Sequence, residues 1–400
     1  MSASAPSIGN VVDGRLLVSV EEACERAARY AEPLDGDETL PLTRAIGRTL
    51  ADTIYAKAAL PRFDQSAMDG YAIRAASAIP GGTLTVCAKV AAGDLGGTLA
   101  DGTAARILTG APLPSGADAV VMQEHVVRRG DEILISEIVQ QGANIRRRGE
   151  DIAQGERLFE PGQAIDARHM ALLTSQGVQH VRVRRRLRIA VVSTGNELRQ
   201  PGEELSDACI FDTNRPMLLS LAGQAGMEAI AGGWIPDDRL ALAGHLYDLS
   251  FRADLIVTTG GASGGDEDHS SEAVRRAGGV VETLQMALKP GKPAVVGRIG
   301  QASYLGLPGN PVSALVSWLL LGRSMSAKLQ GRPQPVRLGY PLPLLGYFER
   351  RPGKTEFVPA KLAAFEGRPA LQILGRGGSA RLKPLVDADG LAEIAADEGS

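Results

Sequence analysis

The segment from Leu187 to about Gln330 alternates between apolar strand-like runs and helical patterns, and this alternation constrains the fold most strongly. The strand-like runs read RIAVVST, EAIAGGW, DLIVTT and PAVVGRI, and the helical ones read NRPMLLSLAGQAG, DRLALAGHLYDLSF and PVSALVSWLLLGRSMSAKL. Such alternation predicts a parallel sheet with helices on both faces. Because ligands of these sheets bind beyond the carboxyl ends of the strands, the loops that follow the strands are the first candidates for a site.

The regions on either side of this segment have other periodicities. Val18 to Tyr30 has the apolar spacing of an amphipathic helix. From about residue 50 to 145, short strand patterns alternate with Gly/Pro turns, and Arg128–Asp131 is a hairpin turn signal. Short strand-like pieces return after Arg332. We therefore expect an α/β region flanked by two β-rich regions.

Composition argues against several classes of protein. Aromatic residues make up 4% of the chain and the formal net charge is −3. These values disfavour a base-stacking nucleic-acid module and give no global attraction to nucleic acid or membranes. The Arg184–Arg186 cluster is interpreted as a solvated connector, because no aromatic residue is interleaved with it.

The cysteines and the N-terminus bear on the compartment. Three cysteines without CxxC spacing predict neither a disulfide framework nor a zinc site. We expect them to be buried small residues in a reducing compartment. MSASAPSIGN lacks a signal-peptide pattern, and no apolar run approaches the roughly 20 residues of a membrane span. A cytoplasmic protein without membrane or nucleic-acid partners is expected.

Two loops after predicted strands carry residues suited to an anion and a cation. STGNEL (193–198) offers Gly195 for close backbone approach and Glu197 to face a ligand, although alone it is also typical of a plain turn. TTGGASGGDED (258–268) combines free amides with Asp266 and Asp268, which could bind Mg²⁺. The alternative for these acids is charge compensation at a helix N-terminus. Neither a Walker nor a Rossmann spacing is present.

Two further loops suit phosphate. LPGNPVSAL predicts Asn310 as N-cap and Pro311 as the first helical residue, with free amides directed at an anion. Lys289 and Lys292 flank a rigid Pro-Gly and could bind phosphate as point charges. An ordinary capped helix and two solvated lysines are the alternatives.

Loops of the first β-rich region also carry charged residues. Asp69 lies in PRFDQSAMDGYAIR, Thr109 in RILTGAPLP, and Arg146 and Asp151 in NIRRRGED. For any one of these residues, simple surface ion pairing is the default interpretation.

Taken together, these segments resemble the molybdopterin molybdenumtransferase family, whose eukaryotic counterpart is the E domain of gephyrin. The resemblance rests on motifs in the family's order, namely FDQSAMDGYA, RILTGAP, NIRRRGEDI, STGNEL, DTNRP, TTGGASGGDED, KPGKP, LPGNPVSA and GGSARL. Several positions differ from the family's usual pattern: Gln285 stands where a lysine is common, Pro359 stands where E-F-x-R carries arginine, S-G-G replaces S-V-G in the glycine loop, and G-N-E-L replaces G-D-E-L.

The resemblance implies an α/β multidomain fold of four domains. These are a discontinuous connecting domain (1–48 and 142–186), a β-rich domain (49–141), an α/β molybdopterin-binding domain (187–330) and a C-terminal β-barrel-like domain (331–400), the last shorter than usual. It also implies a homodimer whose site is shared between the α/β domain of one subunit and the β-rich domain of the other.

The implied reaction inserts molybdenum from molybdate into adenylylated molybdopterin with Mg²⁺-dependent release of AMP. The implied catalytic residues are Asp69, Thr109, Asp151, Glu197 and Asp268, and the implied metal ligands are Asp268, Glu197 and Asp266. The implied substrate-binding residues are Arg146, Ser193, Thr194, Gly195, Asp237, Gly260, Gly261, Ser263, Lys289, Lys292, Pro308, Gly309, Asn310 and Ser379. The molybdopterin adenylyltransferase and molybdoenzyme chaperones are candidate protein partners.

Two alternatives stay open at this stage. The adenylyltransferase step shares the T-G-G segment, but the β-rich region with FDQSAMDGYA argues against it. A non-catalytic scaffold or cofactor-storage protein is the alternative from another class.

Overall fold

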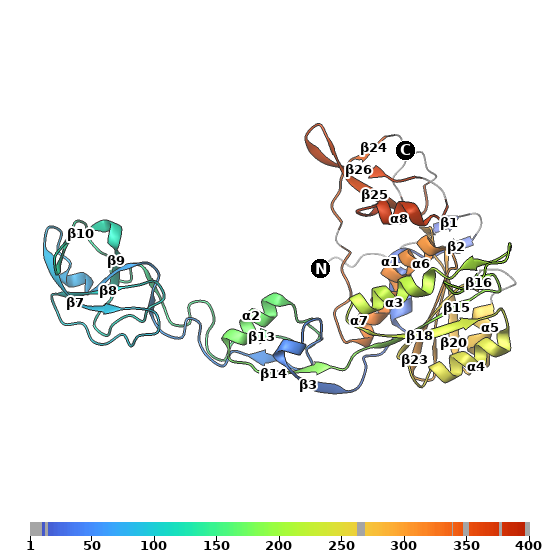
Figure 1. Cartoon of the computed structure of the whole chain (residues 1–400), viewed down its shortest axis with the longest axis horizontal. Helices are drawn as coiled ribbons and strands as arrows, with labels where there is room; N and C mark the ends of the chain where they lie inside the picture. The colour runs from blue at the N-terminus through green and yellow to red at the C-terminus, as the bar shows by residue number, and fades with distance from the viewer. Residues whose placement is uncertain are drawn as a thin grey trace. The chain divides into compact units, whose positions relative to one another are not determined.

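The computed structural model describes residues 10–12, 15–261, 269–337, 339–346, 352–375 and 378–396. They form two compact units: one comprises residues 52–160 and 168–179, and the other comprises the described parts of 1–51, 161–167 and 180–400 (Figure 1). The four domain boundaries implied by the resemblance are finer than this division and stay a prediction. Within the described residues, no helix is both long enough and apolar enough to cross a bilayer.

A six-stranded sheet forms the centre of the larger unit, in the order β18-β15-β19-β23-β22-β20. The strands are β15 (Arg188–Thr194), β18 (Glu228–Ile235), β19 (Leu255–Thr259), β20 (Val280–Gln285), β22 (Pro293–Ile299) and β23 (Ala302–Leu307). β18, β15 and β19 are parallel, as predicted. β23 and β20, which were not predicted as strands, run in the same direction, whereas β22 is antiparallel to both of them. The prediction of a wholly parallel sheet is wrong there, because the short turn between β22 and β23 leaves no room for a crossover helix.

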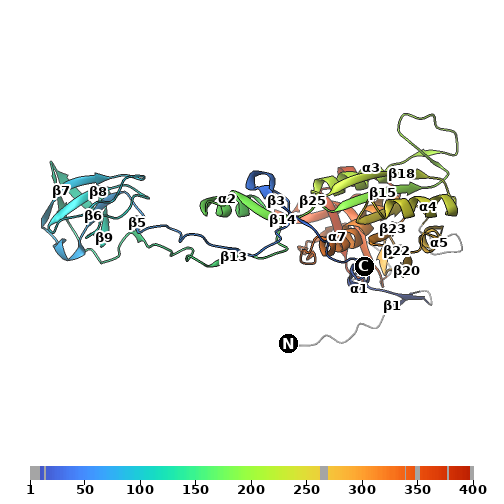
Figure 2. The ribbon, with the colours of Figure 1, turned by 90° about the horizontal axis from the view of Figure 1, so that it is seen from below.

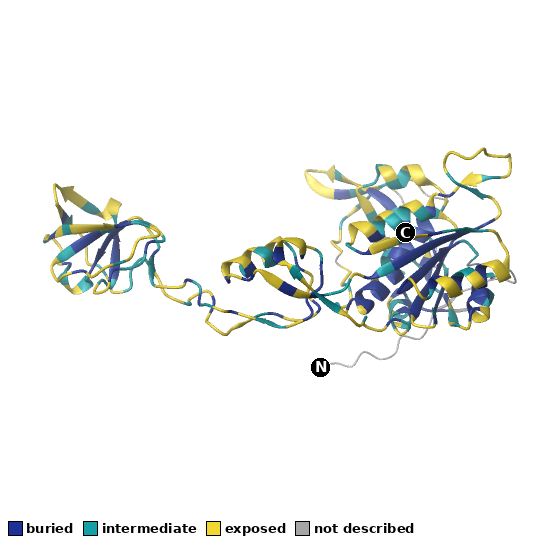
Figure 3. Cartoon of the chain, turned by 60° about the horizontal axis from the view of Figure 1, so that its bottom comes forward, coloured by how far each residue is buried: buried dark blue, intermediate teal, exposed yellow. Residues whose placement is uncertain are grey.

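Helices cover both faces of this sheet, as the sequence predicts. Ile189 and Val191 of β15 pack on one side, in a core shared with α1, α3 and α6, whereas Ala190 and Val192 pack on the other side with α4 and α5. Figure 2 shows α3 beside β15 and β18, and Figure 3 shows the buried strands between the helices. The helices are α1 (Val20–Ala28), α3 (Asn214–Gln224), α4 (Arg239–Leu249), α5 (His269–Arg276), α6 (Pro311–Ser317), a π-helical turn (Trp318–Gly322) and α7 (Arg323–Leu329).

The C-terminal residues form a separate mixed sheet. It contains β25 (Thr355–Phe365), β26 (Arg368–Ile373), β24 (Leu344–Leu345) and β27 (Gly390–Ile394), and α8 (Leu382–Asp387) packs against β25. The short strand β21 (Leu288–Lys289), from the loop that precedes β22, pairs with β25. This pairing joins the C-terminal sheet to the α/β region. The small ladders of this unit are β1–β2 (Asn10–Val12, Arg15–Leu17), β3–β14 (Asp37–Pro41, His180–Arg184) and β16–β17 (Leu198–Arg199, Ile210–Phe211).

The smaller unit is β-rich, as predicted. Its main sheet has the order β10-β11-β7-β8-β6-β9, and the predicted hairpin joins β10 to β11. The elements are β4 (Ile54–Tyr55), β5 (Gln65–Ser66), β6 (Gly70–Ile73), β7 (Thr83–Val90), β8 (Thr103–Ile107), β9 (Ala119–Met122), β10 (Val126–Arg129), β11 (Glu132–Ile135), β12 (Ile145–Arg146), β13 (Arg157–Phe159) and α2 (Ala167–Ser175). Short 3₁₀ turns lie at Leu42–Arg44 in the larger unit and at Ala75–Ser77 and Gln123–His125 in this one. The expectation that the cysteines are buried is wrong: Cys87 is exposed at a break in the β7–β8 register, and Cys24 and Cys209 are only half-buried.

Asp254 holds the amino-terminal ends of the central strands together. Its side chain is 6% exposed, and its two oxygens accept hydrogen bonds from Arg185 Nη1 at 2.7 Å and from Arg188 Nη2 at 2.9 Å. Burial raises the pKa of this carboxyl, but the hydrogen bonds from both arginines outweigh burial and hold the pKa below its ordinary value. Arg184 likewise pairs with Asp37 at 3.0 Å. The interpretation of Arg184–Arg186 as wholly solvated is therefore wrong for Arg184 and Arg185.

We predict that Asp254→Asn lowers the free energy of unfolding by about 2–4 kcal/mol at pH 7, because two arginines lose their anionic partner. Since the folded-state pKa of Asp254 is depressed, this stabilisation is present above the unfolded-state pKa of about 3.9 and is lost as pH falls through the folded-state value. Urea unfolding at several pH values measures both effects. Asp387→Asn, which removes an exposed pair with Lys383, should cost less than about 1 kcal/mol. Equal losses in the two variants would contradict the assignment.

The carboxyl ends of the same strands approach each other so closely that only glycine fits. Gly260, directly after β19, has a φ of +97°, and a Cβ there would lie 2.2 Å from the Thr194 carbonyl oxygen. Gly309, after β23, approaches the Gly260 Cα, because a Cβ at Gly309 would lie 3.7 Å from it. The loops after β15 and β19 therefore depend on glycine at position 260, whereas the loop after β23 lies at ordinary contact distance from them.

Gly260→Ala should lower the free energy of unfolding by about 2 kcal/mol or more beyond the cost of its positive φ, because the added methyl group must displace backbone. Gly278→Ala is the matched control, since Gly278 has a φ of +78° and nothing within 4 Å of the added Cβ. Thermal or urea unfolding compares the two variants. The same loss in both would show that the close approach to Thr194 is not constraining.

Candidate active site

The strand-end loops of the larger unit bring together most of the predicted site residues of the α/β region. Ser193 pairs with Thr259, and Thr259 pairs with Leu307, so the loops after β15, β19 and β23 leave the sheet at one edge. The same edge receives the loop between β20 and β22, because Gln285 pairs with Pro293. The predicted residues at this edge are Ser193, Thr194, Gly195, Glu197, Asp237, Gly260, Gly261, Lys289, Lys292, Pro308, Gly309 and Asn310.

Asn214 fixes two of these loops, and sequence reasoning did not assign it a role. Its Nδ2 donates to Thr259 Oγ1 at 2.7 Å and to the Gly309 carbonyl oxygen at 2.6 Å. Asn214 is the first residue of α3 and is buried. A polar amide at a buried helix start in D-T-N-R-P was the available signal, because such a side chain requires polar partners.

Buried polar atoms at this edge lack partners. Ser193 Oγ, Thr194 Oγ1 and Asn214 Oδ1 have no hydrogen-bond partner in the part of the chain that the structure describes. A buried polar atom without a partner costs about 1–3 kcal/mol, so these atoms suit contact with a polar ligand or water. The two hydroxyls can donate to and accept from such a ligand, whereas the amide oxygen can only accept.

The loop after β15 presents an acid, Glu197, that forms no ion pair within the described part of the chain. Gly195 has a φ of +145°, and a Cβ there would lie 2.5 Å from Glu197 Oε2, so the carboxylate of Glu197 lies over the glycine. Asn196 N donates to Asp237 Oδ2 at 3.1 Å, and Asp237 N donates to Asn196 Oδ1 at 3.1 Å. This reciprocal pair joins the loops after β15 and β18. Glu197 is exposed and available as an oxygen donor.

The two predicted lysines have different surroundings. Lys289 Nζ lies 3.3 Å from Oε1 of Glu356, whose side chain is 5% exposed. Lys292 is half-buried and forms no ion pair with a described residue. Sequence reasoning missed Glu356, because β21 and β25 are 67 positions apart in the chain. Lys292 is therefore the lysine with an uncompensated charge.

Ser379 and Lys289 line the same small cavity of about 80 Å³, together with Pro359 and Arg381. The carbonyl oxygen of Ser379 accepts a hydrogen bond from Val312 N at 2.9 Å. This contact corrects the expectation of free amides at the start of α6, since Pro311 has no N–H and the Val312 amide is occupied. Asn310 is the N-cap as predicted, although its side chain forms no capping hydrogen bond.

Three predicted residues, Ser263, Asp266 and Asp268, lie outside the described residues. Of the predicted metal ligands, only Glu197 is described. Among the residues that the structure describes, no three His, Cys, Asp or Glu side chains are grouped so as to hold a metal ion. An exposed carboxylate fits the oxygen preference of Mg²⁺, so the chemistry of Glu197 is compatible with the predicted cation.

The remaining predicted residues belong to the smaller unit. Asp69 Oδ1 accepts hydrogen bonds from Thr109 N at 2.8 Å and from Thr109 Oγ1 at 2.7 Å. These bonds, the backbone one first, hold the pKa of Asp69 below its ordinary value, so the carboxylate stays ionised. Asp69 and Thr109, two of the predicted site residues, are thus in direct contact.

Arg146 and Asp151 are not joined to that pair by a hydrogen bond in the described part of the unit. Arg146 Nε donates to Glu150 Oε1 at 3.0 Å, although β12 pairs with β5 shortly before Asp69. Asp151 is exposed next to the bridge between Leu60 and Ile152. The nearby Asp64 is occupied by Arg147 at 2.7 Å, which is structural ion pairing.

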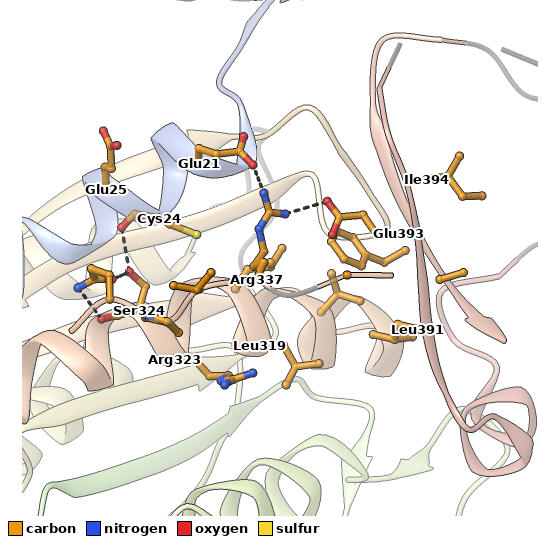
Figure 4. A pocket seen from close by; sticks show the side chains of 18 of the residues that line it. Glu21, Cys24, Glu25, Leu319, Arg323, Ser324, Arg337, Leu391, Glu393 and Ile394 are labelled. Carbon is orange, nitrogen blue, oxygen red and sulfur yellow. Dashed lines mark hydrogen bonds and ion pairs between the residues drawn. The ribbon is translucent and has the colours of Figure 1, made fainter. Parts of the chain in front are cut away.

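A much larger cavity, of about 1530 Å³, lies away from the strand-end loops (Figure 4). The cavity is lined by α1, the π-helical turn, α7 and the C-terminal strands. Arg337 crosses it and pairs with Glu21 and, at 3.0 Å, with Glu393. Burial raises the pKa of the Cys24 thiol there to about 11, so the thiolate is scarce. Arg337, Glu21 and Glu393 are already paired there and the Cys24 thiol is unreactive, so the strand-end edge is the stronger candidate for chemistry.

Comparison with known families matches nearly the whole chain in three segments. The MoeA N-terminal region (domain I and II) matches residues 18–177, a probable molybdopterin binding domain matches 190–327, and the MoeA C-terminal region (domain IV) matches 341–400. The strand-end loops from Ser193 to Asn310 fall within the second segment.

Individual relatives agree. The chain is 36% identical over 370 residues to molybdopterin molybdenumtransferase 2 of Mycobacterium tuberculosis, covering 90% of this chain and 91% of the relative. It is 40% identical over 299 residues to the molybdopterin molybdenumtransferase of Haemophilus influenzae, covering 74% of each. A crystal structure of the molybdopterin biosynthesis MoeA protein from Pyrococcus horikoshii OT3 superposes with a TM-score of 0.80 at 29% identity, covering 96% of both chains. The chain belongs to the molybdopterin molybdenumtransferase family.

Proposed function

We propose that this protein acts in molybdenum cofactor biosynthesis as a molybdenum-inserting transferase that binds adenylylated molybdopterin at the strand-end edge. One observation carries the proposal. Within the segment matched by a molybdopterin-binding domain, the contact between Gly260 and Thr194 places backbone and unpaired buried polar atoms at one edge of the sheet. Polar pockets at this edge are where open α/β sheets bind ligands.

Different described residues would contact different groups of such a substrate. Thr194 Oγ1 and Asn214 Oδ1 offer a donor and an acceptor to polar groups of the pterin or phosphate. Lys292 supplies positive charge to the terminal phosphate, whereas Lys289 shares its charge with Glu356. Arg381 provides a guanidinium in the small cavity that also contains Pro359. Cationic groups suit molybdate, since bare carboxylates would repel an oxyanion.

In the proposed reaction, water attacks the phosphoanhydride of adenylylated molybdopterin, so that AMP leaves and molybdopterin keeps its own phosphate. The dithiolene sulfurs then bind molybdenum delivered as molybdate, and one oxygen of molybdate leaves as water with the two thiol protons. A bound Mg²⁺ would neutralise charge that develops on the phosphate. Glu197 would hold it, together with Asp266 and Asp268, which lie outside the described residues. The role of Glu197 follows from its exposed carboxylate over Gly195.

We further propose that Asp69, Thr109, Arg146 and Asp151 complete the site from the second subunit of a homodimer. The Asp69–Thr109 pair supports this proposal, because two hydrogen bonds orient an exposed carboxylate that forms no ion pair with any described residue. A preorganised, ionised carboxylate on the surface is suited to contact a ligand bound elsewhere.

A molybdopterin carrier without turnover is the second candidate. It is favoured by the pairing of Lys289 with buried Glu356, which reduces the positive charge at the edge. Gln285 and Pro359 reduce it further where lysine and arginine are usual in the family.

Wild-type protein incubated anaerobically with adenylylated molybdopterin, Mg²⁺ and molybdate should release AMP, measured by chromatography. Lys292→Ala should slow this release about 30- to 100-fold, because one charge-assisted phosphate contact is lost. Lys361→Ala, which removes an exposed lysine of β25, is the matched control and should match wild type. If molybdopterin binds but no AMP appears, while an active family member works in parallel, the carrier is correct.

The shared site is tested by mixing two inactive variants. Asp69→Ala and Glu197→Gln should each lose AMP release. A 1:1 mixture should recover up to about a quarter of all sites, since about half of its dimers are mixed and one of the two sites in each mixed dimer is intact. Native mass spectrometry confirms subunit exchange. A mixture that exchanges subunits and stays as inactive as its parents would place both residues in one subunit's site.

A further inference from the structure

A second polar pocket lies at the opposite edge of the central sheet. We call it the arginine pocket, because five of its lining residues are Arg44, Arg48, Arg185, Arg186 and Arg188. Its volume is about 540 Å³, which is within the usual range for small-molecule sites. All of these residues belong to the larger compact unit.

Elements distant in sequence build this pocket. Arg188 is the first residue of β15 and pairs in register with Glu228, the first residue of β18. Arg44 ends the 3₁₀ turn that follows β3, and Arg186 lies in the connector after β14. The pocket is therefore at the amino-terminal ends of the parallel strands, whereas the candidate active site is at their carboxyl ends.

Several arginines are held in place by carboxylates. Arg48 has a side chain that is only 6% exposed and is paired with Glu38. Arg48 Nη2 also donates to the Arg184 carbonyl oxygen at 2.7 Å. Asp254 orients both Arg185 and Arg188. These guanidinium groups are thus fixed before any ligand arrives, which reduces the entropy lost on binding.

The remaining charge is positive. The five arginines face Glu38 and Glu228 in the lining and Asp254 behind it, so two positive charges are left over. Arg44 and Arg186 are exposed and form no ion pair with any residue that the structure describes. An excess of two charges matches a dianion.

The lining also restricts the class of ligand. It contains no aromatic side chain, so a nucleobase has nothing to stack on, and Leu40 is its one apolar residue. Guanidinium groups from several directions match the oxygens of a tetrahedral dianion through paired N–H donors. We propose that the arginine pocket binds a phosphate-type dianion, either free or as the phosphate group of a small molecule.

The proposal predicts saturable binding of inorganic phosphate to the full-length chain, measured by isothermal titration calorimetry in a chloride buffer. Arg44→Gln combined with Arg186→Gln should weaken this binding at least about tenfold, because two charge-assisted contacts are lost. The matched control, Arg128→Gln combined with Arg129→Gln, removes the same charge from the β10–β11 hairpin and should leave binding unchanged. Lys292→Ala should also leave it unchanged, which separates this pocket from the strand-end edge.

Three probes distinguish the sources of the dianion. Equal affinity for phosphate and molybdate would identify a free-oxyanion site, and tighter binding of AMP than of phosphate would identify a phosphomonoester site. Both outcomes support the proposal if the double variant of Arg44 and Arg186 binds the anion more weakly than wild type. Because Arg44 and Arg186 are exposed, their substitution should leave the fold intact, and circular dichroism checks this. Absence of saturable binding to wild type, equal binding to the double variant, or binding confined to an oligonucleotide would overturn it.

Discussion

The close approach of Gly260 to the Thr194 carbonyl oxygen is the contact on which the candidate site depends. Any Cβ at Gly260 would lie 2.2 Å from that oxygen, so the loops after β15 and β19 can meet only through a glycine. Asn214 then joins the loop after β23 to the same point through two hydrogen bonds. The polar atoms that face this junction are left without partners among the described residues because backbone packing, rather than polar pairing, determines their positions.

Much of the architecture was predictable because it follows from local periodicity. The fold class is confirmed: three of the four predicted apolar runs became buried strands, the fourth became the partly exposed edge strand β18, and helices cover both faces. The order of β22 and β20 was not predictable from periodicity, since a strand pattern does not specify direction. Only the short turn between β22 and β23 determines that these two strands run antiparallel to each other.

The site was predictable where a motif is continuous and was missed where partners are distant. The glycine loops were identified because close approach requires glycine. In contrast, Glu356 reaches Lys289 from another sheet, and Ser379 occupies the Val312 amide from the segment between β26 and β27. No spacing in the sequence encodes such pairings. They matter because they leave Lys292, rather than Lys289 or the start of α6, as the available anion-binding group.

The central sheet thus presents different chemistry at its two ends, with unpaired polar atoms at the carboxyl edge and oriented arginines at the amino edge. Hydrogen exchange of backbone amides on adding adenylylated molybdopterin tests the assignment of the carboxyl edge most directly. The account predicts slowed exchange in peptides that contain Thr194–Glu197, Thr259–Gly261 and Leu307–Ser313. Protection confined to the cavity beside α1, with these loops unchanged, would contradict it.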